Sequence, residues 1–452
     1  MVHPEPTSTP AKGLATFLVV WAGQLVSVTG TTLTGFGLQI WIYLETGSVT
    51  RLALVSLAYA LPAVILSPFA GVLADRIDRR LAMLGADVLA GISTLAIAVL
   101  YFTGSLQLWH IYALSGLGAI GNALQVPAWM ASIPLLVPKK HLGRANGLVM
   151  TAEAVSIVVS PAAAGALLAT LGLGAVLLAD VATFVVAVAT LALVRFPRPE
   201  PTPAQQVPSV RREMAEGLRY LRERHGLLGL LLIYAGVNFV LAFTNVLVIP
   251  LVVSFSSEAA AGGVLSAAGF GMLAGSLAVS AWGGPRHRRI AWVMGGIATG
   301  GLAVVVVGLR PSLLLITGGY VVLSLLLPVV NTASQVVWQL KVPPALQGRV
   351  YSLRRMLSQV ASPLAIVLTG PLADRVFEPL LAEGGGLARS LGKIVGTGTG
   401  RGIAFMFVLA GLGTSLMAAI GWMHPRVRRI EIEIPDQIPD APPAVGIETA
   451  AS

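Results

Sequence analysis

The chain alternates between apolar stretches of about 20 residues and short polar or charged connections. A stretch of that length spans the hydrocarbon core of a bilayer when it is helical. About twelve such stretches follow one another, and almost no sequence is left over for a water-soluble domain. The pattern predicts an all-α membrane protein with twelve transmembrane helices.

The composition supports a membrane protein and argues against a nucleic-acid partner. Hydrophobic residues make up 55% of the 452 positions and charged residues 11%, whereas a soluble domain carries about 25% charged residues. A net charge of +10 can mark a nucleic-acid-binding surface. Here the basic residues form short clusters between apolar stretches, as the bias toward cytoplasmic Lys and Arg produces. The absence of Cys excludes disulfides and thiolate metal sites, and we expect neither a metal nor a cofactor.

The apolar stretches divide into two groups of six. We expect a disordered cytoplasmic tail at 1–13, an N-terminal six-helix bundle at 14–196, a cytoplasmic linker at 197–226, a C-terminal six-helix bundle at 227–423 and a cytoplasmic tail at 424–452. The Pro-rich linker continues into the basic, amphipathic Val210–Arg224, which predicts a surface helix. The tail becomes acidic and Pro-rich from Arg426, and disorder is expected there. The twelve helices are expected at 14–44, 52–74, 81–103, 108–133, 145–170, 174–196, 227–253, 261–284, 289–309, 312–340, 348–372 and 401–423.

The distribution of basic residues predicts the orientation. If the N-terminus lies inside, 24 of the 30 Lys and Arg residues fall on the inside and six on the outside. A single missed helix would scramble this alternation, so the asymmetry also supports the helix count. We expect a multi-pass protein of the cell membrane, the inner membrane where there are two, with both termini in the cytoplasm.

Short sequences recur in the same order in the two halves, which indicates an internal repeat. Val137-Pro138 with Gly143-Arg144 precedes the fifth helix and returns as Val342-Pro343 with Gly348-Arg349 before the eleventh. Asp78-Arg79-Arg80 is echoed by His287-Arg288-Arg289. Two parallel six-helix halves of this kind place the substrate near the midplane between them.

The connection between the second and third helices carries the most specific motif, Gly71-Val-Leu-Ala-Asp75-Arg76-Ile-Asp78-Arg79-Arg80. Its pattern resembles the loop between helices 2 and 3 of the major facilitator superfamily, which usually has a second Gly where this chain has Asp78. We expect Asp75 to lie against the N-terminus of the eleventh helix, near Gly348 and Arg349, because the helix dipole favours an anion there. Gly71 would permit close approach, and Arg76, Arg79 and Arg80 complete this gating hinge. A solvated basic turn that only fixes orientation is the alternative.

Two longer segments narrow the resemblance. They resemble the branch of the superfamily that contains the enterobactin exporter and macrolide efflux proteins. The first segment contains Trp21-Ala-Gly23-Gln24 and Trp41-Ile-Tyr43, and the second runs from Gly348-Arg349 to Gly370-Pro371-Leu-Ala-Asp374-Arg375. The resemblance covers roughly residues 14–425 and implies export coupled to inward proton movement. One motif departs from the pattern, because antiporters often carry Gly-x-x-x-Gly-Pro in the fifth helix and this chain has Ser156-x-x-x-Ser160-Pro161.

Polar side chains recur on single faces of the first, fourth, seventh and tenth helices, which are the central helices of the superfamily's fold. Polar residues within the membrane tend to face the bundle interior or a watery cavity. The candidate cavity residues are Gln24, Ser27, Thr31, Thr34, Asn122, Gln125, Trp129, Asn238, Asn245, Asn331, Gln335 and Trp338. Taken singly, each could instead bond neighbouring helices and contribute about 1 kcal/mol. The uncharged, Trp-containing lining favours an amphipathic solute.

Three carboxylates fall inside predicted helices, and burial disfavours their charged form. Glu153 is the first candidate for proton coupling, since its counterpart in the repeat is Ser358 and only one half carries an acid there. Asp180 and Asp87 lie nearer the ends of their helices and are the other candidates. For each of the three, a structural hydrogen bond is the alternative.

The sequence disfavours two other classes of protein. A Gly-x-x-x-x-Gly-Lys-Ser/Thr phosphate loop is absent, which argues against an ATP-driven pump. Asp75 and Asp78 could hold magnesium for a membrane enzyme, but no second acidic cluster accompanies them and adjacent arginines compete. We therefore expect a monomeric, proton-coupled exporter of a siderophore, a peptide natural product or a macrolide-like drug; an importer or uniporter of the same fold is the alternative.

Overall fold

The computed structural model describes residues 14–76, 78–137, 142–194 and 210–437, and within them it contains helices and no strands. Six long helices form the N-terminal half: α1 (Leu14–Thr46), α2 (Val49–Arg76), α3 (Arg79–Phe102), α4 (Leu108–Leu136), α5 (Leu142–Leu171) and α6 (Leu173–Leu193). Six more form the C-terminal half: α8 (His225–Val253), α9 (Glu258–Trp282), α10 (Arg289–Leu309), α11 (Leu313–Lys341), α12 (Pro344–Leu372) and α15 (Arg401–Met423). The predicted fold class, twelve membrane helices in two six-helix bundles, is confirmed.

Ten of the twelve long helices in the described part are long and apolar enough to cross a membrane. The other two are α4 and α12. The first of these carries Asn122 and Gln125, and the second begins with Arg349, Arg354 and Arg355. Both nevertheless pack within the molecule, α4 against α2 and α3 and α12 against α2 and α8, so their polar residues can be placed away from lipid.

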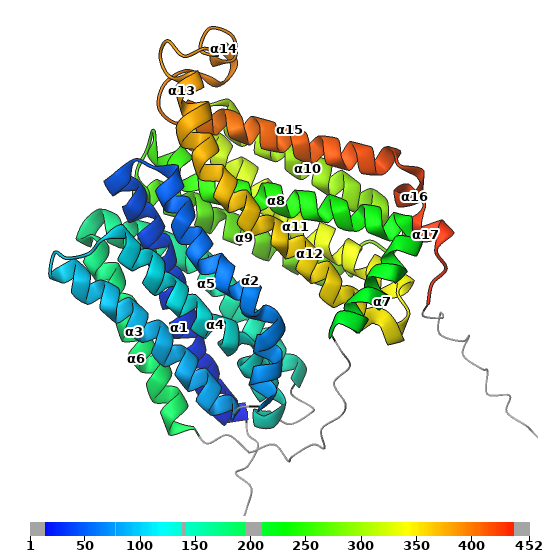
Figure 1. Cartoon of the computed structure of the whole chain (residues 1–452), viewed down its shortest axis with the longest axis horizontal. Helices are drawn as coiled ribbons and strands as arrows, with labels where there is room; N and C mark the ends of the chain where they lie inside the picture. The colour runs from blue at the N-terminus through cyan, green and yellow to red at the C-terminus, as the bar shows by residue number, and fades with distance from the viewer. Residues whose placement is uncertain (1–13, 77, 138–141, 195–209, 438–452) are drawn as a thin grey trace, which may run out of the picture.

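Two short elements mark the opposite ends of the molecule (Figure 1). The helix α7 (Val210–Glu223) lies at one end, and the π-turn η2 (Ala373–Phe377) leads at the other end into the short helices α13 (Glu378–Leu381) and α14 (Gly392–Val395). We call these the α7 end and the α13 end.

The apolar core is continuous between the bundles at the α13 end and divided at the α7 end. One cluster of buried residues combines Leu52 and Val176 of the N-terminal bundle with Val248 and Phe407 of the C-terminal bundle. Two further clusters each stay within one half, the first around Phe17 and Met83 and the second around Leu227 and Trp338. The ribbons accordingly diverge toward the α7 end (Figure 1).

Small residues bring the bundles into close contact at the α13 end. A Cβ atom on Gly262 of α9 would collide with the backbone of Pro161 on α5, and one on Gly370 of α12 would collide with the backbone of Thr50 on α2. Small residues at helix crossings allow this approach in membranes, where van der Waals packing drives association. Serines stand where glycines are expected in the fifth helix, and they bind the neighbouring helix. Ser160, next to Pro161, donates a hydrogen bond of 2.9 Å to the Thr29 carbonyl on α1.

A charged contact joins the two bundles at this end. The Asp374 carboxylate of η2 accepts hydrogen bonds from the Ser48 hydroxyl at 2.7 Å, the Val49 amide at 3.0 Å and the Thr50 amide at 2.9 Å. Those amides are at the N-terminus of α2, where free N–H groups and the helix dipole both favour an anion. This contact closes the α13 end.

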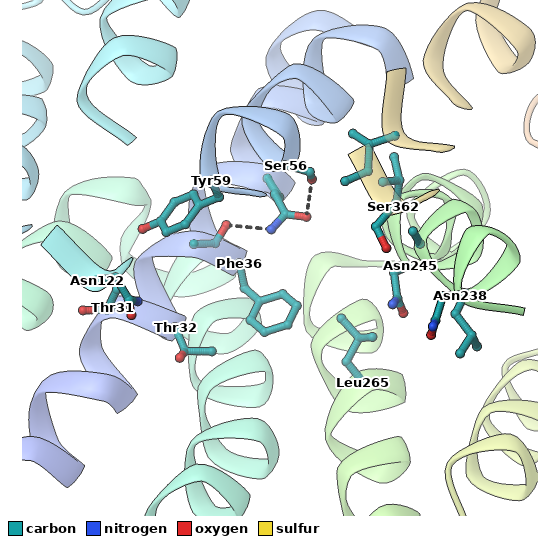
Figure 2. Close-up of a pocket in the computed structure, with 16 residues that line it drawn as sticks. Thr31, Thr32, Phe36, Ser56, Tyr59, Asn122, Asn238, Asn245, Leu265 and Ser362 are labelled. Atoms are coloured by element: carbon teal, nitrogen blue, oxygen red, sulfur yellow. Dashed lines mark hydrogen bonds between the residues drawn. The ribbon is translucent and has the colours of Figure 1, made fainter. Parts of the chain in front are cut away.

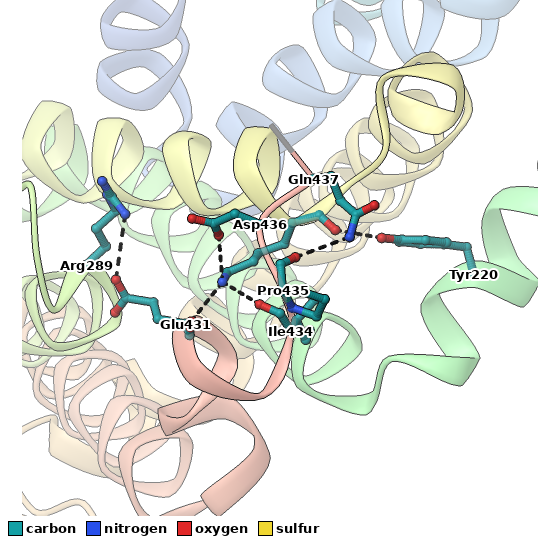
Figure 3. A network of polar contacts seen from close by, with 8 residues as sticks. Tyr220, Arg289, Glu431, Ile434, Pro435, Asp436 and Gln437 are labelled. Carbon is teal, nitrogen blue, oxygen red and sulfur yellow. Dashed lines mark hydrogen bonds and ion pairs between the residues drawn. The ribbon is translucent and has the colours of Figure 1, made fainter. Parts of the chain in front are cut away.

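The C-terminal segment is ordered where the sequence predicts disorder. Residues 425–437 contain α16 (Pro425–Arg428) and α17 (Ile430–Glu433), and Val427 and Ile430 are buried. The buried ammonium of Lys341, at the end of α11, donates to the carbonyls of Glu431 and Ile434 and pairs with Asp436 at 2.8 Å (Figure 3). The acidic, Pro-rich composition predicts disorder, but the acidic side chains of this segment pair with basic residues at the ends of α10 and α11, and these contacts order it.

We predict that Lys341→Met lowers the melting temperature of the purified protein by several degrees. The substitution leaves two carbonyls and Asp436 without their donor, a loss of about 1–3 kcal/mol. Lys393→Met is the control, because Lys393 is exposed in α14. Equal melting temperatures for the two variants would contradict the role of Lys341.

We predict that Asp374→Asn shifts the protein toward a form that is open at the α13 end. Loss of the charge removes a helix-dipole interaction of about 0.3–2 kcal/mol, which corresponds to roughly a twofold to thirtyfold change in the conformational equilibrium. Because the natural chain has no Cys, spin labels at Arg51→Cys and Arg375→Cys can report the distance across this end. Glu45→Gln removes one exposed carboxylate and serves as the control. An unchanged distance distribution in Asp374→Asn would refute the closure.

Candidate functional site

A central cavity of about 740 Å³ lies between the two bundles. It is on the α7 side of the closure, since its wall on α2 begins about two turns beyond Thr50 and its wall on α12 ends one turn before Gly370. Both halves contribute to it. The lining includes Thr31, Thr32, Phe36 and Gln39 of α1, Ser56 and Tyr59 of α2, Asn122 of α4, Asn238, Leu241 and Asn245 of α8, Leu265 of α9, and Ser362 and Ile366 of α12.

The cavity wall is uncharged and mixes amides and hydroxyls with aromatic and aliphatic groups (Figure 2). Gln39 is held in place because its amide donates to the Gly35 carbonyl at 3.2 Å while its oxygen accepts from Ser56 at 3.5 Å. Asn238 and Asn245 lie on α8, across the cavity from Phe36 and Tyr59. Such a wall can hold an amphipathic molecule, with apolar contacts for most of its surface and a few hydrogen bonds to orient it.

Four of the predicted cavity residues line this cavity: Thr31, Asn122, Asn238 and Asn245. Four others, Ser27, Thr34, Gln125 and Gln24, lie deeper in the N-terminal bundle, and Asn331 lies in the C-terminal bundle. The remaining three pack elsewhere. Trp129 stacks on Phe17 with ring centroids 5.7 Å apart, and Gln335 and Trp338 contact Arg354.

A smaller space, which we call the N-terminal polar pocket, surrounds Asp87 of α3. It has a volume of about 30 Å³ and is formed by α1, α2, α3 and α4. The Asp87 side chain is 1% exposed and accepts hydrogen bonds from the amides of Gln24 at 3.1 Å and Gln125 at 2.5 Å. The amide of Gln125 also donates to the Gln24 oxygen at 2.8 Å, so three helices are joined around one acid.

Asp180 of α6 is also buried, at 4% exposed, but it lies in a different setting. It accepts a hydrogen bond of 2.9 Å from Thr94 of α3, and Gly30 of α1 packs directly against it. It does not belong to the wall of the polar pocket or of the central cavity. These contacts favour the structural role that the sequence left open for Asp180.

Glu153 is placed differently from the two buried acids. Its side chain is exposed on α5 and is not part of the wall of the central cavity. Proton coupling by Glu153 stays a prediction.

An apolar chamber extends from the central cavity into the C-terminal bundle. Its volume is about 160 Å³, and it shares Asn238 and Leu241 with the central cavity. Gly296 and Gly300 of α10 leave room for it against Leu323 and Val330 of α11, and Asn331 lies at its edge. An apolar part of a bound molecule could enter this chamber.

Arg354 lies in the C-terminal bundle and is engaged by its neighbours. Its guanidinium donates to the Gln335 oxygen at 2.8 Å and lies 5.1 Å from the ring of Trp338 and 5.8 Å from that of Tyr234. These contacts explain why Gln335 and Trp338 share a face with the cavity residues of α11 yet turn away from the cavity: they hold the half-buried guanidinium of Arg354.

The predicted gating hinge is only partly described. Gly71, Asp75 and Arg76 are at the end of α2, and Gly348 and Arg349 are in the first turns of α12, but their side chains and that of Arg79 lie outside the described part of the structure. Arg80 is described, and it donates to the carbonyls of Leu191 and Ala192 at the end of α6. Arg80 thus caps a helix of its own bundle.

The sequence analysis missed the contributions of α2, α9 and α12 to the cavity. Ser56 and Tyr59 are three residues apart on α2 and face the cavity together, and Ser362 enters from α12. The spacing of Ser56 and Tyr59 was a usable signal, because residues three apart share a helix face. Polar faces were expected only on the four central helices of the superfamily's fold, and α2 is not one of them.

Comparisons with known proteins agree with this architecture. A sequence model for the Major Facilitator Superfamily matches residues 20–366. Macrolide efflux protein A of Streptococcus pyogenes is 30% identical over 368 residues, which cover 80% of this chain and 90% of the relative. Multidrug efflux pump Tap of Mycolicibacterium fortuitum is 25% identical over 343 residues, covering 74% and 83%.

Among solved structures, a bacterial homologue of the human lysosomal transporter Spinster in an inward-facing, unoccupied conformation superposes with a TM-score of 0.72 at 18% identity, covering 94% of this chain and 98% of the other. That likeness concerns the fold. The twelve helices, the cavity between two bundles and the extent of the sequence match lead to one conclusion: the chain is a multi-pass membrane transporter that belongs to the major facilitator superfamily.

Proposed function

We propose that this protein exports an amphipathic small molecule, of the macrolide kind, from the cytoplasm in exchange for protons. The central cavity carries the proposal. Its volume of about 740 Å³ lies in the range of about 300–1,000 Å³ that holds drug-sized ligands, and its wall contains no charged side chain among the described residues. A siderophore or a peptide natural product would have to present a largely uncharged surface to fit it.

The names of the relatives support this substrate class. Two relatives are described as a macrolide efflux protein and a multidrug efflux pump. A large lactone with sugar substituents offers apolar surface for Phe36, Leu241 and Leu265 and hydroxyls for the amides of Asn238 and Asn245. The apolar chamber of the C-terminal bundle would accept an alkyl group of such a molecule.

We propose that the α7 end faces the cytoplasm. The bias of Lys and Arg toward the connections on that side supports this orientation, which puts both termini in the cytoplasm and the Asp374 contact outside. The protein then acts as a monomer in the cell membrane, with its cavity on the cytoplasmic side of the closure. An exporter in this form can load its substrate from the cytoplasm or from the inner leaflet.

Protons are the proposed coupling ion, with Glu153, Asp87 and Asp180 as the candidate carriers. An importer or uniporter of the same fold would have the same cavity, because a single conformation does not set the direction of transport.

We predict that Phe36→Ala weakens the apparent affinity for erythromycin by roughly tenfold to a hundredfold, because the loss of one large apolar contact removes about 1.5–3 kcal/mol. The measurement is erythromycin efflux from cells of a sensitive strain that expresses the protein. Phe270→Ala is the matched control, since Phe270 is 61% exposed on α9 and is not part of the cavity wall. Equal loss in both variants, or in neither, would contradict the cavity as the binding site.

We predict that, in proteoliposomes, the protein moves erythromycin out of the compartment that the α7 end faces, while protons move down their gradient into that compartment. Transport that ignores the gradient would remove the coupling, and uptake in the reverse direction would favour the importer. Glu153→Gln should abolish gradient-driven transport and keep exchange if Glu153 carries the proton. A fully active Glu153→Gln variant would exclude that residue as the carrier.

A further inference from the structure

The N-terminal polar pocket is connected to the central cavity through shared walls. Thr31 of α1, Tyr59 of α2 and Asn122 of α4 border both spaces. Two hydroxyls and an amide therefore stand between the substrate and the buried Asp87. The boundary that an ion would cross from the cavity to this pocket therefore includes polar side chains.

The pocket has the size and the ligands for one small cation. Its volume of about 30 Å³ is enough for at least one water molecule or one small cation. Its wall offers hydroxyl and amide oxygens from Ser27, Thr31, Ser93, Ser115 and Asn122 beside the carboxylate. Oxygen atoms of this kind bind hard cations and also pass protons.

The hydroxyl of Ser115 has an open hydrogen-bonding position in this pocket. Ser115 of α4 is 4% exposed, and its hydroxyl has no hydrogen-bond partner in the described part of the chain. A buried hydroxyl without a partner is costly unless a ligand or water meets it. Ser115 lines the pocket that contains Asp87, so a ligand bound there would give the Ser115 hydroxyl a partner and would also contact the Asp87 carboxylate.

The charge of Asp87 has no counter-ion among the described side chains. The groups that face it are the neutral amides of Gln24 on α1 and Gln125 on α4. Tyr59 on α2 borders the same pocket, and the other buried acid described in this bundle, Asp180 on α6, is bonded to Thr94 two turns further along α3. An ionised Asp87 at this depth requires a positive charge from outside the protein.

We propose that Asp87 is the binding site of the coupling cation, a proton or Na⁺, and that this ion reaches the pocket from the central cavity. This inference rests on the proposed function, which it extends by assigning the ion to one residue. A proton converts the carboxylate into a neutral carboxyl group, whereas Na⁺ binds beside the carboxylate with the hydroxyl oxygens as further ligands. In both cases the occupied pocket is neutral.

The first test needs no transported substrate. The melting temperature of the purified protein is measured from alkaline to mildly acidic pH in K⁺, and then at alkaline pH with Na⁺ in place of K⁺ at constant ionic strength. The wild type should gain a few degrees on acidification if the ion is a proton, or on addition of Na⁺ if it is sodium. Asp87→Asn should lose that gain, and Asp180→Asn should keep it.

The second test measures erythromycin transport in proteoliposomes under a proton gradient or a Na⁺ gradient. Asp87→Asn should reduce gradient-driven transport to the level seen without a gradient and retain exchange. If the wild type moves no erythromycin, the proposed substrate is wrong, and the melting experiment still decides the ion site. Should Asp87→Asn fail to fold, Asp87→Glu should shift the midpoint of the cation dependence, and Asp180→Glu should leave it unchanged.

Two results would overturn the inference. One is a cation dependence that persists in Asp87→Asn, or a midpoint that does not move in Asp87→Glu. The other is a loss of the dependence in Asp180→Asn with Asp87→Asn unaffected, which would assign the ion to Asp180 and make Asp87 a structural acid.

Discussion

A polar group inside a bilayer is costly unless the protein gives it a partner or a watery space, and this constraint organises the whole molecule. The chain carries amides, hydroxyls and acids on several of its twelve long helices. They are collected in the interior of the N-terminal bundle, along the wall of the central cavity and around Arg354 in the C-terminal bundle. Apart from positions such as the exposed Glu153 of α5, the faces that remain are mostly apolar and can meet lipid. Helices with several polar residues can therefore cross the membrane because those residues face the cavity instead of lipid.

Closure of the α13 end leaves the cavity on the α7 side of the molecule. Small residues let α5 approach α9 and α2 approach α12, and the Asp374 carboxylate at the N-terminus of α2 adds a charged contact to this packing. At the other end the apolar core is divided between the bundles, and the C-terminal segment ties the ends of α10 and α11 within one bundle. Separating the bundles at the α7 end therefore exposes no apolar core that the two bundles share. The bundles can then move as units around the cavity.

The fold could be read from the sequence because it depends on the lengths of apolar stretches and the charges between them. All twelve long helices of the described part begin and end within a few residues of the expected positions. The helix-dipole contact expected for Asp75 is seen for Asp374, within the same Leu-Ala-Asp-Arg sequence at the opposite end of the molecule. The site was harder to read, because helix periodicity shows which residues share a face and not which neighbour the face meets. Gln335 and Trp338 turn toward Arg354 for this reason, and Ser56 and Tyr59 of α2 enter the cavity although their helix was considered only for its loop.

Accessibility of the cavity from each side of the membrane tests the account most directly. A cysteine at Ser362, a cavity position on α12 in a chain without natural Cys, can be alkylated by a reagent that does not cross the bilayer. The account predicts reaction from the side of the α7 end in the resting protein, and reaction from the opposite side when substrate and an ion gradient drive the transport cycle. Reaction from both sides at once, or a reactivity that substrate and gradient leave unchanged, would contradict the movement of two bundles around a shared cavity.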